Sequence, residues 1–163
     1  MSGIIDTVGS KSGIVGSDIY PAGHVIQTQA VSSNNRETTT SSSWNSSWDT
    51  TLAITPYIAS SNIWLCATLQ CYSSSGAAFF DFYKNASDVT ETYNLSGLSY
   101  GLSEIHNDEN WCATAITFID PVAENSISTK TYTISGRTGG AGTTYIGGGA
   151  NAGVTLTIME IAT

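Results

Sequence analysis

The sequence predicts an all-β fold, an antiparallel, jelly-roll-like β-sandwich of about eight strands with an extended N-terminal arm. Only 11% of the residues are charged, whereas an ordinary globular domain has about a quarter. Serine, threonine, asparagine and glycine replace the missing charges, which is a composition of strands and turns rather than of helices. Short apolar–polar alternations recur between turn signals, and no segment shows a helical period.

The alternation predicts eight or nine short strands in chain order. They cover residues 24–31, 48–55, 63–72, 77–84, 90–94, 111–119, 129–135, 143–146 and 154–161. Turn signals separate them, among them Pro56 and the pair Asp120-Pro121. Residues 32–43 are polar and predict an exposed loop or edge ribbon, residues 97–109 predict a loop, and the glycine cluster at 136–142 predicts a flexible turn.

The number and length of the connections favour one arrangement of these strands. About eight strands with some long crossings fit a jelly roll better than an immunoglobulin-like domain, which has fewer strands. In the strand at 63–72, Ile63, Leu65, Ala67 and Leu69 share one face, opposite Trp64 and Cys66. The apolar strand at 154–161 should lie centrally, because an apolar edge strand invites aggregation.

Residues 1–19 differ from the rest of the chain, so we divide it into an anchoring arm at 1–19 and a sandwich domain at 20–163. Glycines interrupt the arm every few residues and leave its backbone free. Its apolar residues, which a disordered tail would not usually carry, are Ile4, Ile5, Val8, Ile14 and Val15. We expect this arm to become ordered on another protein surface; a frayed terminus is the alternative.

Charge and hydropathy exclude several partners. The chain has 13 acidic and 5 basic residues, a net charge of −8, so phosphate backbones would be repelled and no nucleic-acid partner is expected. No apolar run is long enough for a membrane helix, and we expect no membrane association. The first residues lack the basic and apolar regions of a signal peptide.

The three cysteines predict no metal site or disulfide framework. Cys66, Cys71 and Cys112 are an odd number without metal-type spacing, so we interpret them as small buried hydrophobes. Cys66 and Cys71 are five positions apart and would face opposite sides of one strand, which prevents a bridge between them.

The densest group of titratable residues lies at 104–109. Glu104, His106 and Asp108 could hold a hard cation, but the segment lacks the glycine-bearing spacing of a calcium loop, and a solvated acidic loop is favoured. Paired carboxylates for glycoside hydrolysis remain an alternative, since strands bring distant residues together. We predict no catalytic residue, no metal and no cofactor.

Aromatic residues in predicted loops give one further candidate site. Trp44, Tyr93 and Tyr100 could stack on sugar rings or contact a partner. The alternative is that these rings belong to the core or to a subunit interface, which is the commoner use of large aromatics in a small β domain.

Several short motifs resemble one family of proteins. They are the opening MSGII, the GSKSG at 9–13, the YPAGHVIQ at 20–27, the ITP at 54–56 with SSNI at 60–63, the Asp120-Pro121 turn and the final TLTIMEIA at 155–162. Together they resemble jelly-roll structural proteins of marine and freshwater tailed phages, cyanophages among them. The resemblance implies a trimeric capsid decoration or cement, head-fibre or tail-fibre module without catalytic residues.

From the residues and this resemblance we expect a non-enzymatic bacteriophage virion structural protein. It would form a homotrimer on the virion surface after synthesis in the host bacterial cytoplasm. Its arm would attach it to the major capsid protein or to tail or fibre proteins. The chain is too short for a long shaft, which favours a compact decoration. The alternative is a tail-fibre or tail-tip module that binds a receptor or a host surface glycan.

Overall fold

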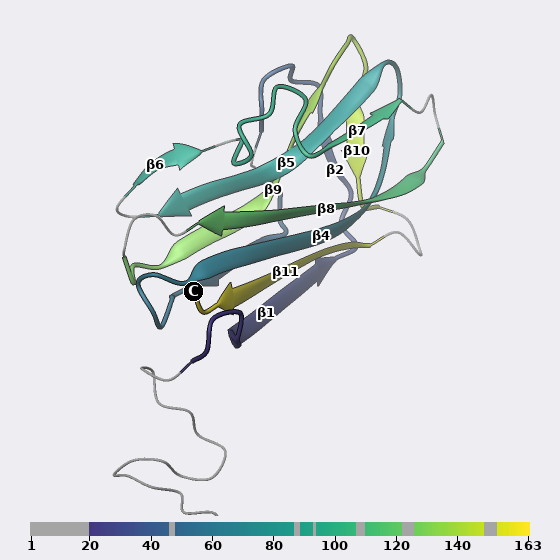
Figure 1. Ribbon diagram of the computed structural model, residues 1–163. Coiled ribbons are helices and arrows are strands. Elements are labelled where there is room, and N and C mark those ends of the chain that lie inside the picture. The colour runs from purple at the N-terminus through teal and green to yellow at the C-terminus, as the bar shows by residue number, and fades with distance from the viewer. Residues whose placement is uncertain are drawn as a thin grey trace, which may run out of the picture.

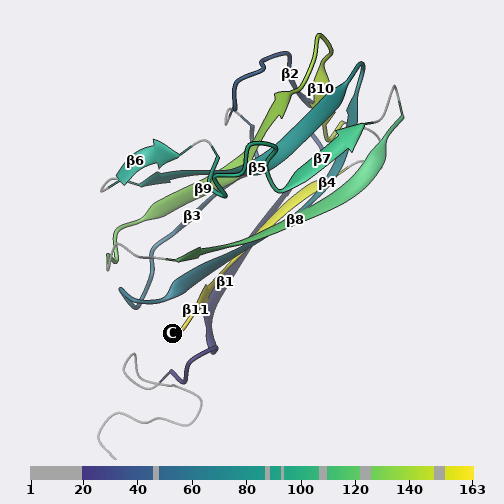
Figure 2. The same ribbon diagram turned by 45° about the horizontal axis from the view of Figure 1, so that its top comes forward.

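The computed structural model describes residues 20–163 except 46–47, 87–88, 93, 107–109, 122–125 and 149–152. Within these residues the chain forms eleven strands and no helix. The strands make two antiparallel sheets packed face to face (Figures 1 and 2). The predicted arm at 1–19 lies outside the described residues.

Six strands form the first sheet and five form the second. The first contains β1 (Val25–Ser33), β11 (Val154–Ile161), β4 (Asn62–Ser73), β10 (Thr144–Ile146) and β2 (Glu37–Thr39), with β8 (Cys112–Pro121) also paired to β4. The second contains β3 (Thr51–Ile54), β9 (Lys130–Thr138), β5 (Ala77–Ala86) and β6 (Val89–Thr92), with β7 (Ser103–His106) also paired to β5.

Eight of the strands pair as the two arms of one long hairpin would. β1 pairs with β11, β3 with β9, β4 with β8 and β5 with β7, always antiparallel. The hairpin is wrapped up, so that β11 also pairs with β4 and β9 with β5. The result is two four-stranded sheets, β1-β11-β4-β8 and β3-β9-β5-β7, which is a jelly roll. The predicted fold class is therefore confirmed, and β2, β6 and β10 are short additions to it.

All nine predicted strands are present, and β11 is central, between β1 and β4. Two strands were not predicted as such. β2 lies in the polar stretch at 32–43, which is thus partly an edge ribbon. β7 lies in the region 97–109, so the prediction of a loop is wrong for residues 103–106, whereas residues 97–102 lie outside any strand. Both are short and pair through backbone groups at a sheet edge, so their sequences carry no strong hydrophobic alternation.

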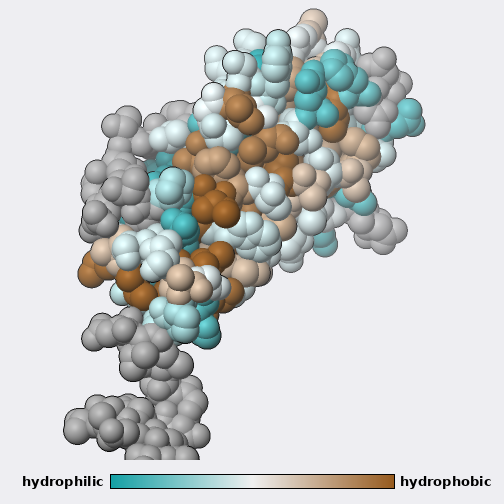
Figure 3. Space-filling model, viewed as in Figure 1, coloured by the Kyte–Doolittle hydropathy of each residue, from teal (hydrophilic) through white to brown (hydrophobic). Residues whose placement is uncertain are grey.

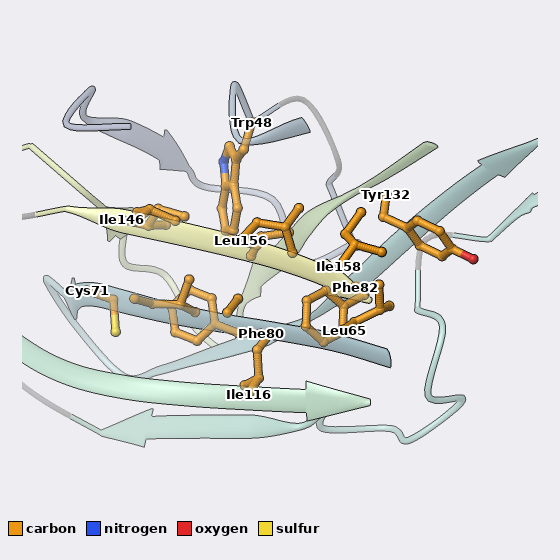
Figure 4. Close-up of a cluster of buried hydrophobic side chains, with 14 of the residues drawn as sticks. Trp48, Leu65, Cys71, Phe80, Phe82, Ile116, Tyr132, Ile146, Leu156 and Ile158 are labelled. Atoms are coloured by element: carbon orange, nitrogen blue, oxygen red, sulfur yellow. The ribbon is translucent and has the colours of Figure 1, made fainter. Parts of the chain in front are cut away.

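The core lies between the two sheets and follows the predicted alternation. Alternate residues of β4, beginning with Ile63, are buried, and the same is true of β11. Figure 4 shows Trp48 reaching into this core towards Leu156 and Phe80. A Cβ atom at Gly136 would lie 2.0 Å from the Trp48 ring. Gly136 is part of β9 rather than of the predicted flexible turn, and it is a glycine whose missing side chain leaves the space that the indole occupies.

A buried ion pair joins the two sheets. Asp120 of β8 has its Oδ2 atom 2.9 Å from Lys84 Nζ of β5, and the same oxygen accepts a 2.6 Å hydrogen bond from the Tyr132 hydroxyl of β9. All three side chains are almost inaccessible to solvent. Removing one partner of such a pair leaves a buried charge and costs roughly 3–5 kcal/mol.

A second buried carboxylate fixes the connection between β3 and β4. Glu160 of β11 is fully buried, and its oxygens accept hydrogen bonds of 2.7–3.0 Å from the Gln27 amide, the backbone N–H groups of Tyr57 and Ile58, and the Ser61 hydroxyl. Hydrogen bonds to a charged group are stronger than those to neutral groups. Glu160 thereby ties residues 57–61 to the first sheet.

Candidate interaction surfaces

The four jelly-roll strands of the first sheet present an outer surface without any charged side chain. Side chains alternate along each strand, so the outward set follows from the register. As far as the pair of Gln70 and Ala113, it consists of Val25, Thr28, Ala30 and Ser32 of β1, Thr155, Thr157, Met159 and Ile161 of β11, Asn62, Trp64, Cys66, Thr68 and Gln70 of β4, and Ala113, Ala115, Thr117, Ile119 and Pro121 of β8. We call this surface the uncharged face. Tyr72, the next outward residue of β4, lies beyond that pair and beneath Arg36.

The side chains of the uncharged face line up in rows across the four strands. One row runs Thr28, Met159, Trp64 and Ile119, and the next runs through Thr157 and its neighbours. Ile119 is 52% exposed. Figure 3 shows white and brown surface over β8, β4 and β11, with teal mainly at the margin. The face is therefore neutral and partly apolar, which is unusual for the solvent-exposed side of a sheet.

A groove of about 450 Å³ lies at one end of the uncharged face. Its lining comes from β4, from β8 and from the residue before β11: Thr68, Leu69, Gln70, Ala113, Thr114, Ala115 and Gly153. It lies where β11 begins at Val154 while β4 continues to Ser73.

Beyond this groove lies the first aromatic cluster, formed by Arg36, Tyr145, Tyr72 and Trp111. The rings of Tyr72 and Tyr145 are stacked, with centroids 4.2 Å apart, and Trp111 meets Tyr72 edge-on at 4.7 Å. The Arg36 guanidinium lies 4.4 Å from the centre of the Tyr145 ring and donates a 2.9 Å hydrogen bond to the Tyr72 hydroxyl. Trp111 is 41% exposed, so this cluster presents an aromatic ring to solvent.

The outer side of the second sheet is different, because the chain itself covers it. Outward residues of β5 and β9, including Phe79, Asp81 and Ser135, are buried. The connection between β6 and β7 runs along β5, as Figure 2 shows, with the Leu95 N–H donating to Phe82 O and the Leu102 N–H to Phe80 O. We call residues 94–102 the covering segment.

A buried aspartate holds the covering segment in place. Asp81 accepts hydrogen bonds from the Ser96 hydroxyl, from the Ser96 N–H at 3.2 Å and from the Phe82 N–H at 2.6 Å. Burial raises the pKa of Asp81, and the hydrogen bonds from Ser96 and Phe82 oppose that shift. The covering segment therefore both supplies hydrogen bonds to Asp81 and lies over this outward-facing carboxyl group.

A second aromatic cluster forms where the covering segment meets the residues before Trp48. The Arg137 guanidinium lies 4.4 Å from the Phe79 ring centre and 5.3 Å from that of Trp44, and it donates to Ser99 O at 2.7 Å. Tyr100 packs on Phe79 with ring centroids 5.3 Å apart and is 62% exposed.

Of the predicted contact residues, the structure thus brings Trp44 and Tyr100 into one cluster, whereas Tyr93 lies outside the described residues. Sequence reasoning missed Arg137 and Phe79, which complete this cluster, and the whole first aromatic cluster. No local pattern marks these residues, since each cluster is assembled from segments that are distant in the chain.

The acidic group at 104–109 is only partly described. Glu104 and His106 lie on β7, with Glu104 Oε1 2.6 Å from His106 Nε2, and both are exposed; Asp108 and Glu109 lie outside the described residues. Among the described residues, no group of three or more His, Cys, Asp or Glu side chains is placed to hold a metal ion. The same residues contain no helix of the length and hydropathy needed to span a membrane.

The cysteines are arranged differently from the sequence interpretation. Cys66 and Cys71 lie on opposite sides of β4, as predicted, but only Cys71 is buried, whereas Cys66 and Cys112 are partly exposed. However, Cys71 lies directly opposite Cys112 on β8, with the two Sγ atoms 3.9 Å apart. The sequence offered no signal for this pair, because the register between β4 and β8 depends on the whole fold.

Two solved structures that resemble this fold come from infectious bursal disease virus. The crystal structure of its VP2 subviral particle matches with 12% identity and a TM-score of 0.41, and the match covers 98% of this chain and 43% of that chain. A structure of the Gx strain of the virus matches with 13% identity and a TM-score of 0.41, over 85% of this chain and 37% of that chain. This chain spans less than half the length of either. No protein-family model and no curated protein matches the sequence.

Proposed function

We propose that this chain is a non-enzymatic structural protein of a bacteriophage virion. It acts as a trimeric module on the particle surface, a capsid decoration or cement protein or a short fibre, attached through residues 1–19 to other virion proteins. The observation that carries the proposal is the uncharged face, which suits contact with a second copy of the chain. The resemblance of the sequence motifs to tailed-phage structural proteins supports the placement in a virion.

The charge of the protein favours a second copy as the occupant of this face. Two copies that each carry a net charge of −8 repel one another wherever acidic groups meet. The uncharged face avoids that cost, and its threonine, alanine and apolar side chains leave no buried charge in a contact. In a threefold ring each copy presents this face to a different surface of the next copy, which closes the assembly.

The size of the uncharged face is also adequate for an interface. Four strands spaced by about 4.8 Å and about eight residues of 3.3 Å rise give a footprint on the order of 500 Å². Stable interfaces bury roughly 800 Å² on each partner. The face therefore supplies the larger part of an interface, and neighbouring groups such as the first aromatic cluster supply the rest.

A charge placed in the middle of the face tests the assembly. Thr157 faces outward between Ala30 and Cys66, so Thr157→Glu should convert trimers into monomers in light-scattering measurements at micromolar concentration. Ala53→Glu is the matched control, because Ala53 is an exposed strand residue of the second sheet and its variant should remain trimeric. A wild-type protein that is monomeric under the same conditions, or a Thr157→Glu trimer, would contradict the proposal.

Deleting residues 2–19 tests the attachment. The shortened protein should remain folded and trimeric, as judged by circular dichroism and light scattering, but should no longer join phage particles. Particles that incorporate the shortened protein as well as the full chain would show that attachment does not use the arm.

The second aromatic cluster favours one other candidate function, a receptor- or glycan-binding tail-fibre or tail-tip module. Arg137 lies over the rings of Trp44 and Phe79, and Tyr100 packs on Phe79. An aromatic ring beside a guanidinium suits a sugar with its hydroxyl groups. A glycan array should then give signals that Trp44→Ala and Tyr100→Ala remove and Tyr57→Ala, at another exposed tyrosine, keeps. The absence of any glycan signal for the wild-type protein would eliminate this function.

A further inference from the structure

The opposed cysteines of β4 and β8 have the geometry of an unformed cross-strand disulfide. Cys71 and Cys112 are direct partners in the antiparallel register. Residues in such positions have Cα atoms about 4.5–5.5 Å apart, which is within the range that a disulfide spans. Their Sγ atoms are 3.9 Å apart, and Cys112 Sγ is 3.4 Å from Cys71 O. A small rotation of the side chains is enough to bring the sulfurs into bonding distance.

The surroundings of the pair also suit a reversible bond. Cys112 is the first residue of β8 and is partly exposed, whereas Cys71 is buried in the core. Among the described strands β8 pairs only with β4, so it is an edge of the first sheet. Cys112 can therefore meet a small reagent in water, and the end of an edge strand can adjust to a new bond more easily than a central strand.

We propose that Cys71 and Cys112 form a reversible disulfide, by exchange with a small-molecule disulfide such as oxidised glutathione, that fastens the edge strand β8 to β4. This inference goes beyond the proposed function and does not depend on it. The crosslink would lie beside the first aromatic cluster, because Tyr72 and Trp111 are the sequence neighbours of the two cysteines. Oxidation would thereby fix one end of the uncharged face.

The reaction balances as two successive thiol–disulfide exchanges. The thiolate of Cys112 attacks the small disulfide, forms a mixed disulfide and releases one small thiol. The Cys71 thiol then loses its proton and attacks Cys112 Sγ, which releases the second small thiol. Two protein thiols are oxidised and one small disulfide is reduced to two thiols. Burial and the neighbouring Cys112 thiol raise the pKa of Cys71, so the second exchange should be the slower one and should accelerate as pH rises.

Peptide mapping of the native full-length protein tests the pairing directly. After equilibration with oxidised glutathione and digestion without reductant, the peptide containing Cys71 should be linked to the peptide containing Cys112, and dithiothreitol should separate them. Cys66→Ser should keep this link and Cys112→Ser should lack it. The proposal is overturned if Cys71 and Cys112 in the wild-type protein remain thiols, carry separate glutathione adducts, or if Cys66 is the residue that becomes crosslinked.

A thermal measurement tests whether the link fastens β8. A disulfide between Cys71 and Cys112 would close the loop formed by residues 72–111. Disulfides that close loops of this length commonly stabilise a protein by an amount that corresponds to an increase in Tm of roughly 5–15 °C. The oxidised wild-type protein should therefore melt at a higher temperature than the reduced protein, and Cys112→Ser should show no such difference. An oxidised protein that melts no higher than the reduced one would show that the bond does not fasten the strand.

Discussion

The two sheets of the sandwich differ in whether the chain itself covers their outer sides. The chain covers the outer side of the second sheet with residues 94–102, held by Asp81 and by the cluster around Arg137. The outer side of the first sheet has no such cover among the described residues, and it carries no charge on its four jelly-roll strands. The difference indicates what lies against the outer side of each sheet. The second is completed by its own chain, and we propose that the first is completed by another copy.

If this comparison is correct, variants on the covered side should change stability, and variants on the uncharged face should change assembly. The strongest effect is expected at Gly101 in the covering segment. Its φ is +70°, and a Cβ atom there would lie 2.4 Å from Phe80 O and 2.7 Å from the Trp44 ring. Gly101→Ala should therefore lower the free energy of unfolding by roughly 3 kcal/mol in urea titrations.

Gly97 provides the matched control for that variant. Its φ is +71°, but no atom lies within 4 Å of a Cβ atom built on it. Gly97→Ala should cost only the backbone strain, about 1 kcal/mol. Equal losses in the two alanine variants would show that the covering segment does not press on β5 and Trp44.

The next effect concerns the carboxylate that holds the covering segment. Asp81→Ala leaves the Ser96 hydroxyl and N–H without their acceptor, and should lower the free energy of unfolding by about 2 kcal/mol. Amide exchange of residues 94–102 should accelerate more than that of β4. Uniform acceleration across the molecule would indicate that Asp81 supports the whole sandwich instead of this segment.

Asp81 should also make stability depend on pH. Its pKa is raised in the folded protein, so the folded state holds the proton more tightly than the unfolded state does. The stabilisation from this group is therefore complete below the ordinary aspartate pKa and is lost as pH rises through the raised value. Urea titrations from acidic to neutral pH should show this decline in the wild-type protein and a smaller one in Asp81→Asn.

The smallest effect on stability is expected on the uncharged face. Thr117 of β8 points outward and is exposed, so Thr117→Lys should change the unfolding free energy of the monomer by less than about 0.5 kcal/mol. The same variant should weaken association in light-scattering measurements, because it places a charge in the proposed contact. A large loss of monomer stability would show that Thr117 has a structural role within its own chain.

The sequence was most informative where a strand has one buried and one exposed side. In β4 and β11 the contrast between alternate residues correctly predicted the strand and the two sets of residues that lie on its opposite faces. The contrast is weak in β2 and β7, which are short, polar and at sheet edges, and there the prediction failed or stayed open. Hydrophobic alternation reports burial, and these strands bury little.

Pairings between distant strands could not be predicted in the same way. Tyr72 stacks on Tyr145, and Cys71 lies opposite Cys112, only because β10 and β8 pair with β4 in a particular register. That register depends on how the entire hairpin is wrapped, and no local pattern encodes it. The sequence shows that the chain has few charged residues. It does not show that uncharged residues come together on the outer side of the first sheet, because that depends on the strand register.

The nested pairing of the strands has a consequence for synthesis of the protein. β11 occupies the position between β1 and β4, so the first sheet cannot close until residues 154–161 have left the ribosome. Contacts between such distant parts of a chain give a high contact order and slow folding. Until then β1 and β4 each keep an unpaired edge, which is an opportunity for aggregation. The scarcity of charge on the first sheet thus leaves the nascent chain prone to aggregation, and the rate at which β11 inserts should determine the yield of soluble protein.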